Sequence, residues 1–80
     1  MVFQKAAVIG GGSFGTVVAN ILADNNIRTV QWMRNEAIAR EVNEQHQNSA
    51  YVPGVELNPE LTASTNLVEC VTNASQYAMW

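Results

Sequence analysis

Hydrophobic and polar positions change their spacing along the chain, and each spacing predicts a different element. Residues 6–9 form a short continuous apolar run that stops at three glycines, which favours a strand covered on both faces. After the glycines, helical periodicity extends from Ser13 to the polar stretch 24–26. One apolar face of this amphipathic helix carries Phe14, Val17, Val18, Ile21 and Leu22. The chain therefore begins with a predicted strand, a glycine turn and a helix.

The next segment repeats the order of strand and helix. Residues 29–33 are rich in β-formers and predict a second strand. Asn35 can cap a second helix, because its side chain can accept hydrogen bonds from the amides of the first turn. The inner face of this helix is predicted to carry Ile38, Val42 and Gln45.

The rest of the chain is less regular. Residues 47–60 contain proline and glycine breakers and predict a loop, whereas residues 61–63 predict a brief strand. Asn66, with Glu69 three positions later, resembles the capping box of a third helix. That helix is predicted to point Leu67, Val71 and Ala74 inward. A further apolar run at 77–80 stops after its fourth residue, so we expect the sequence to be the beginning of a larger protein.

Composition and charge exclude several classes of function. The chain is 48% hydrophobic and 14% charged, which is typical of a globular protein. Its net charge of −3 offers no basic field to a nucleic acid or an anionic membrane surface. The sequence contains neither an apolar run long enough for a membrane span nor the features of a signal peptide. We therefore expect a cytoplasmic protein in which Cys70, the single cysteine, is a small buried hydrophobic residue.

The strongest chemical signal is the pattern Gly-x-Gly-x-x-Gly at Gly10, Gly12 and Gly15. It follows a predicted strand, begins a helix and precedes a second strand, which is the context of a dinucleotide-binding fold. The first glycine allows the tight turn, the second lets the backbone approach a pyrophosphate, and the third allows close packing. We therefore predict an α/β fold of the Rossmann type, truncated to the N-terminal βαβ portion of a doubly wound parallel sheet. Residues 1–80 would form the N-terminal part of an NAD(P)-binding domain, with the substrate and catalytic domain absent.

The residue type at the end of the second predicted strand indicates which cofactor the chain binds. An NAD-binding fold places an acidic residue there, on the ribose hydroxyls. This sequence has Arg34 at that position, and Glu36 falls two residues late. Because a planar guanidinium suits a 2′-phosphate, Arg34 favours NADP (NADPH), with NAD as the second candidate. A solvated arginine at a strand end is the alternative interpretation.

Other candidate residues carry weaker signals. His46 is the only histidine, has no Asp, Glu or Cys at ligand spacing, and is expected to be exposed and without function. Ser13 lacks the Gly-x-Ser-x-Gly pattern of a nucleophile elbow. Trp32 is expected to serve packing, and Tyr51 either binds a ligand or anchors its loop. We therefore predict neither a metal site nor a catalytic residue within this chain.

Four segments carry a resemblance to a known family. Residues 7–16 are similar to a strand followed by a Gly-x-Gly-Ser-aromatic-Gly-Thr turn. Residues 32–36 resemble a Trp-x-Arg/His-Asp segment, residues 48–54 an Asn-x-x-Tyr-Leu-Pro-Gly loop, and residues 65–67 a Thr-Asp-Leu helix start. Together they resemble the opening of bacterial NAD(P)-dependent glycerol-3-phosphate dehydrogenases. The combination is more specific than the glycines alone.

The resemblance implies an oxidoreductase that interconverts dihydroxyacetone phosphate and sn-glycerol 3-phosphate by hydride transfer, for glycerophospholipid synthesis. It implies that Ser13 and Phe14 contact the cofactor diphosphate region. Arg34 would contact the adenosine ribose phosphate, and Tyr51 would border the cofactor site. The catalytic lysines of the family lie in later parts of the protein. The chain would therefore be inactive alone and meet the phosphorylated substrate only within the full-length enzyme, whose homo-oligomeric state stays open.

The sequence departs from the family's pattern at three positions. Gly11 stands where Ala is frequent, Asn35 where Asp is usual, and Asn58 in a loop that is normally shorter. None of them touches the expected phosphate cradle. A non-catalytic module that senses a dinucleotide and reports it to a partner is the competing class. FAD and S-adenosylmethionine are further candidate ligands, against which the missing ribose-binding acid counts.

Overall fold

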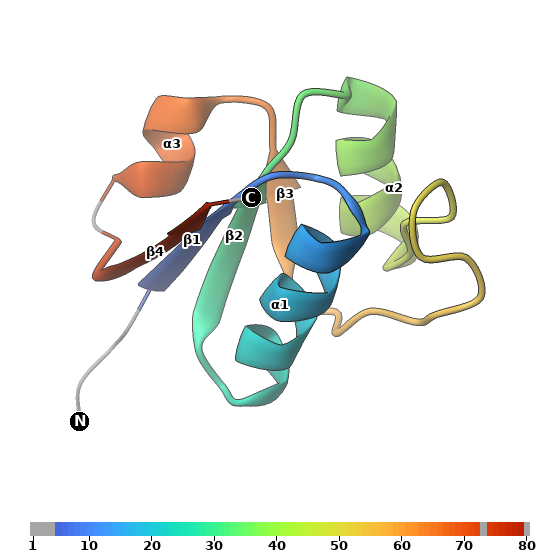
Figure 1. Ribbon diagram of the computed structural model, residues 1–80, viewed down its shortest axis with the longest axis horizontal. Helices are drawn as coiled ribbons and strands as arrows, with labels where there is room; N and C mark the ends of the chain where they lie inside the picture. The colour runs from blue at the N-terminus through green and yellow to red at the C-terminus, as the bar shows by residue number, and fades with distance from the viewer. Residues whose placement is uncertain (1–4, 73, 80) are drawn as a thin grey trace.

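The structure is a computed structural model that describes residues 5–72 and 74–79, in which strands and helices alternate (Figure 1). In chain order the elements are β1 (Lys5–Ile9), α1 (Ser13–Asp24), β2 (Arg28–Trp32), α2 (Glu36–Gln45), β3 (Thr62–Ser64), α3 (Leu67–Val71) and β4 (Gln76–Met79). Each predicted strand is found within one residue of its expected start. Trp80, the last residue of the final apolar run, lies outside the described residues.

The strands form one parallel sheet in the order β3-β2-β1-β4. In Figure 1, α1 and α2 lie on one side of the sheet and α3 lies on the other. Because helices cover both faces, Ala6, Ala7 and Val8 of β1 are all buried. This arrangement confirms the predicted α/β class with its doubly wound parallel sheet. None of the helices in the described ranges is long and apolar enough to cross a membrane.

The hydrophobic core lies where α1 and α2 pack on the sheet. Its buried members are Val8, Ala19, Ala23, Met33, Ala39, Val42, Leu57, Leu61 and Ala63. Leu57 and Leu61 come from the long connection between α2 and β3, so this irregular segment is anchored by its own apolar side chains. Cys70 of α3 is fully buried, as predicted, and burial raises the pKa of its thiol.

The face that α1 turns to the sheet differs from the face that its apolar periodicity marks. Of the apolar residues on that face, Phe14 is 60% and Ile21 53% exposed, whereas Val18 and Leu22 are half-buried and Leu22 packs against the core. The buried residues of α1 are instead Gly15, Thr16, Ala19 and Ala23. A Cβ atom added to Gly15 would lie only 2.6 Å from the carbonyl oxygen of Gly10. The helix therefore lies so close to the glycine turn that small residues must form the contact.

Three further expectations about side-chain placement are wrong. On α2, Gln45 is exposed and Ala39 is buried in its place. On α3, which has five residues, Leu67 is 47% exposed and Cys70 is the buried residue. His46 is half-buried rather than exposed. It ends α2 in a left-handed conformation, with φ of 58°, and its Nδ1 atom is buried.

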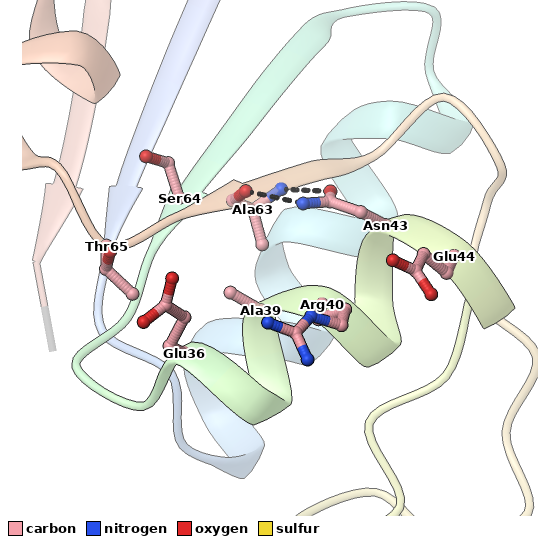
Figure 2. A pocket seen from close by; sticks show the side chains of 8 residues that line it. All are labelled: Glu36, Ala39, Arg40, Asn43, Glu44, Ala63, Ser64 and Thr65. Atoms are coloured by element: carbon pink, nitrogen blue, oxygen red, sulfur yellow. Dashed lines mark hydrogen bonds between the residues drawn. The ribbon is translucent and has the colours of Figure 1, made fainter.

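A side chain of α2 covers part of the edge of the sheet at β3. Asn43 Nδ2 donates to the carbonyl oxygen of Ala63 at 2.8 Å, and the N–H of Ala63 donates to Asn43 Oδ1 at 2.8 Å (Figure 2). The pair resembles one rung of a β-ladder, and it satisfies polar groups that an edge strand otherwise exposes. A groove of about 280 Å³ lies beside it, between α2 and β3. Asn43 thus fixes α2 relative to the sheet.

Candidate functional site

An open cleft of about 570 Å³ lies where the carboxyl ends of β1 and β2 lead to the N-termini of α1 and α2. Parallel strands bring their carboxyl ends to one edge of a sheet, which is where open α/β sheets bind ligands. The lining residues are Gly10, Gly11, Gly12, Trp32, Arg34, Asn35, Ile38 and Tyr51. Four of the residues predicted from the sequence are among them.

The glycines of the turn differ in their surroundings. Gly10 has φ of 140°, a conformation that L side chains rarely adopt, and its N–H donates to the carbonyl oxygen of Trp32 at 2.9 Å. A Cβ atom added to Gly12 would meet nothing within 4 Å. At Gly15 the added atom would collide with the carbonyl of Gly10. The geometry thus provides a tight turn, open space and close packing at successive glycines of the motif.

The N-terminus of α1 lacks the side-chain cap that the two later helices have. Its N-cap is Gly12, which has no side chain to accept a hydrogen bond from the first turn. At α2 the side chain of Asn35 accepts two amide hydrogens, and at α3 the side chain of Asn66 accepts one. Amides and the helix dipole favour an anion at a helix start. The start of α1 can therefore hold an anionic group that enters the cleft.

Positive charge lies on the β2 side of the cleft. Arg34 follows β2, is exposed, and directly precedes Asn35 at the positive end of α2. None of the described residues that line the cleft is Asp or Glu. A guanidinium beside a helix N-terminus, with no lining carboxylate to neutralise it, suits a negatively charged ligand. Phosphate groups have this chemistry.

The loop after α2 forms another wall of the cleft. Ser13 Oγ donates to the carbonyl oxygen of Tyr51 at 2.9 Å, so the hydroxyl ties this wall to the start of α1. The side chain of Tyr51 is half exposed over the cleft. Phe14 is exposed but does not line the cleft, and Gly15 lies buried beneath the turn. The structure therefore places Ser13, Phe14 and Gly15 around the cleft rather than in its lining.

Some lining residues were missed in the sequence. Trp32 was expected to serve packing rather than substrate contact. Its Nε1 donates to the carbonyl oxygen of Thr65 at 2.8 Å, and the residue also lines the cleft. Gly11 lines it as well, and a Cβ atom there would lie 2.6 Å from Met33 Cβ. The buried Met33 therefore explains why glycine, rather than alanine, occupies position 11. The sequence signal that could have identified these two residues is their position, since Gly11 lies in the turn after β1 and Trp32 is the last residue of β2.

Comparison with known proteins identifies related sequences for nearly the whole chain. Residues 5–79 match the profile of a family described as NAD-dependent glycerol-3-phosphate dehydrogenase N-terminus. A glycerol-3-phosphate dehydrogenase [NAD(P)+] of Thermobifida fusca is 46% identical over 88% of this chain, and one of Staphylococcus saprophyticus is 43% identical over 95% of it. The matched regions make up only 21% and 23% of these relatives, so the chain spans about a fifth of their length.

Solved structures agree with this fold. The glycerol-3-phosphate dehydrogenase of Saccharomyces cerevisiae matches 99% of this chain with a TM-score of 0.90 and 26% identity, over 26% of its own length. The enzyme of Coxiella burnetii matches 96% of this chain with a TM-score of 0.86 and 22% identity, over 24% of its own length. The Rossmann-type arrangement predicted from the glycine pattern is thereby confirmed.

Proposed function

The chain belongs to the NAD-dependent glycerol-3-phosphate dehydrogenase family, to whose N-terminal region it corresponds, and on this premise we propose that it forms the cofactor-binding part of such an enzyme. Residues 1–80 then make up the N-terminal part of an NAD(P)-binding domain. The substrate-binding and catalytic parts belong to the portion of the relatives that this chain does not span. The preferred cofactor is NADPH, with NADH as the second.

One observation carries this proposal. The start of α1, with Gly12 as its N-cap, opens onto the same cleft as Arg34. The backbone at Gly12 has space beside it, because an added Cβ atom would meet nothing within 4 Å. The cleft thus offers backbone donors for a diphosphate and a guanidinium for a further phosphate. A dinucleotide phosphorylated on its ribose carries both groups.

The residues of this chain bind and orient the dinucleotide. The helix start at Gly12 holds the diphosphate, Arg34 holds the phosphate on the adenosine ribose, and Tyr51 borders the site. When bound, the reduced nicotinamide supplies the hydride that converts dihydroxyacetone phosphate into sn-glycerol 3-phosphate. Substrate binding and proton donation are left to the part of the enzyme that this chain does not span.

Calorimetric titration of the 80-residue chain tests cofactor binding directly. We expect NADPH to bind at one site per chain and at least as tightly as NADH. FAD and S-adenosylmethionine serve as matched nucleotide controls, because neither carries a 2′-phosphate for Arg34. Absence of NADPH binding to the folded chain, or preferred binding of either control ligand, would contradict the proposal.

The reaction is tested by joining the chain to a catalytic region. In a chimera, residues 5–79 replace the matching segment of the Thermobifida fusca relative. We expect the chimera to oxidise NADPH in the presence of dihydroxyacetone phosphate and the isolated chain to have no activity. A folded chimera that binds substrate but does not use the cofactor would overturn the assigned role. Turnover by the isolated chain would show that the catalytic groups lie within it.

A further inference from the structure

Three polar side chains are completely buried next to the glycine turn. Thr16 belongs to α1, Gln31 to β2 and Asn48 to the loop after α2, and each is 0% exposed. Burial of polar groups is unfavourable unless they are hydrogen-bonded. Thr29 is the one other buried polar residue among those that the structure describes, and the members of the hydrophobic core cluster are all apolar. The gathering of three buried polar side chains at one turn therefore indicates a role beyond packing.

The three side chains form one hydrogen-bonded cluster that also contacts the turn. Gln31 Nε2 and Asn48 Nδ2 both donate to Thr16 Oγ1, each at 3.0 Å. Gln31 Nε2 donates in addition to the carbonyl oxygen of Gly10, at 2.7 Å. Asn48 Nδ2 donates to the carbonyl oxygen of Gly11, at 3.4 Å. The Thr16 hydroxyl is therefore the shared acceptor between two amides that each hold one carbonyl of the turn.

These contacts determine which way the turn presents its peptide groups. In a planar trans peptide, a carbonyl and the N–H of the following residue point in opposite directions. Because the carbonyls of Gly10 and Gly11 point to the buried cluster, the N–H groups of Gly11 and Gly12 point away from it. All three glycines line the cleft. A diphosphate in the cleft would thus meet N–H donors in place of carbonyl oxygens.

Hydrogen bonding determines the orientation of the Gln31 side-chain amide, and this orientation leaves one buried polar atom unsatisfied. Nε2 must face the carbonyl of Gly10, because that oxygen can only accept a hydrogen bond. As a result Gln31 Oε1 is buried without a hydrogen-bond partner among the described residues. An apolar side chain at this position of β2 would avoid the unsatisfied oxygen. The bond to the turn is therefore the feature that a glutamine provides here.

Asn48 also connects the turn to another wall of the cleft. Its Oδ1 accepts a hydrogen bond from the N–H of Tyr51 at 3.3 Å, while its Nδ2 contacts Gly11 and Thr16. Asn48 itself does not line the cleft. One buried amide thus sets the placement of the Tyr51 wall relative to the glycine turn.

We propose that Thr16, Gln31 and Asn48 are positioning residues that direct the backbone donors of the glycine turn toward the diphosphate of the dinucleotide. The inference rests on the proposed function, since it concerns the same cleft. It adds that this half of the site depends on a buried cluster, whereas recognition of the ribose phosphate by Arg34 does not.

The variant Thr16→Val tests this role, because it removes the shared acceptor with little change in volume. We expect NADPH to bind the 80-residue chain at least about tenfold more weakly, as measured by calorimetry. Adenosine 2′-monophosphate, which carries the ribose phosphate but no diphosphate, should bind within about twofold of the wild-type affinity. Thr16→Ser retains the hydroxyl and should restore NADPH binding.

Thr29→Val is the matched control. Thr29 is a buried threonine of β2 whose Oγ1 donates to the carbonyl oxygen of Ile27 at 2.8 Å, away from the cleft lining. Loss of the Thr29 hydroxyl should lower the thermal stability of the chain without changing its affinity for NADPH. If Thr16→Val does not fold, as judged by circular dichroism, Gln31→Met takes its place, because it removes the bond to Gly10 and also the unsatisfied oxygen.

The outcomes separate the two claims. If the folded wild-type chain binds no NADPH, both the proposed function and this inference are wrong. If wild type binds NADPH and the variant binds it equally well, only the positioning role is wrong. A variant that weakens NADPH and adenosine 2′-monophosphate to the same extent also overturns that role, because the effect would then be general to the fold.

Discussion

The two helix N-termini that border the cleft are built in opposite ways. Asn35 caps α2, and its side chain accepts the N–H groups of Ala37 and Ile38 at 2.9 and 3.2 Å. The N-cap of α1 is Gly12, which offers no such acceptor. Both residues line the same cleft. A side-chain cap accepts the first amides of α2, whereas α1 begins without a side-chain cap.

The difference shows how a helix can begin without a local cap. The start of α1 is fixed by tertiary contacts, namely the close packing at Gly15 and the buried hydroxyl of Thr16. The start of α2 is fixed by its own Asn35, and the adjoining Arg34 can direct its side chain to the cleft. The α1 side thus offers positive charge through its backbone, and the α2 side offers it through a side chain.

The largest effect is expected from closing the space beside the uncapped end. Gly12→Val places a β-branched side chain where, in the proposed binding mode, the diphosphate approaches, and we expect cofactor affinity to fall about 100-fold, or about 2.7 kcal/mol. The fold should be retained, because Gly12 has φ of −76° and an added Cβ atom meets nothing within 4 Å. Calorimetry gives the affinity, and circular dichroism gives the helix content.

Gly12→Ala is the graded control for this prediction. Its single added carbon should produce a smaller loss of affinity than valine, because the effect is steric. Near-normal NADPH affinity in a folded Gly12→Val variant would show that the diphosphate does not lie at the start of α1.

A smaller effect is expected at the capped end, where the side chain provides the charge. Arg34→Asp would remove the proposed charge-assisted hydrogen bonds to a 2′-phosphate, which contribute about 1.5–3 kcal/mol, and would introduce repulsion. We expect the preference for NADPH over NADH to fall at least about tenfold, with NADH binding spared or improved. The ratio of kcat/KM values for the two cofactors, measured in the chimera, checks this.

Arg40→Asp makes the same change of charge on α2 at an exposed position that does not line the cleft. It should leave the cofactor preference unchanged. If both substitutions move the NADPH-to-NADH ratio equally, the effect is one of net charge. If neither moves it, Arg34 is a solvated arginine at a strand end.

The smallest effect concerns the cap itself. Asn35→Ala removes an N-cap, which should lower the free energy of unfolding by about 1 kcal/mol. Cofactor affinity should change less than in Gly12→Val, because the Asn35 side chain, and not a ligand, accepts hydrogen bonds from the first amides of α2. Urea denaturation measures the stability, and Asn35→Asp, which retains an acceptor, should preserve it. A larger loss of affinity than of stability would show that α2 also binds the diphosphate.

The sequence by itself determined the features that depend on neighbouring residues. The alternation of strands and helices, the turn at Gly10 and the caps at Asn35 and Asn66 were all predicted, and the structure contains them. These features depend on short-range interactions. A glycine allows backbone conformations that other residues rarely adopt, and a capping side chain accepts a hydrogen bond from an amide two or three residues later. The sequence also assigned Gly12 and Arg34 to one cofactor site, and both residues line the same cleft.

Only the tertiary structure decided which side chains face one another. Apolar periodicity marked the buried face of α1 only in part. Leu22 does pack against the core, but the close approach of the helix to the glycine turn admits small residues and leaves Phe14 exposed. No local pattern shows that Thr16, Gln31 and Asn48 meet, since Gln31 and Asn48 lie 15 and 32 positions from Thr16. They meet because the pairing of β1 with β2 and the path of the following loop bring them together. Contacts of this kind depend on packing between distant segments, which no local pattern encodes.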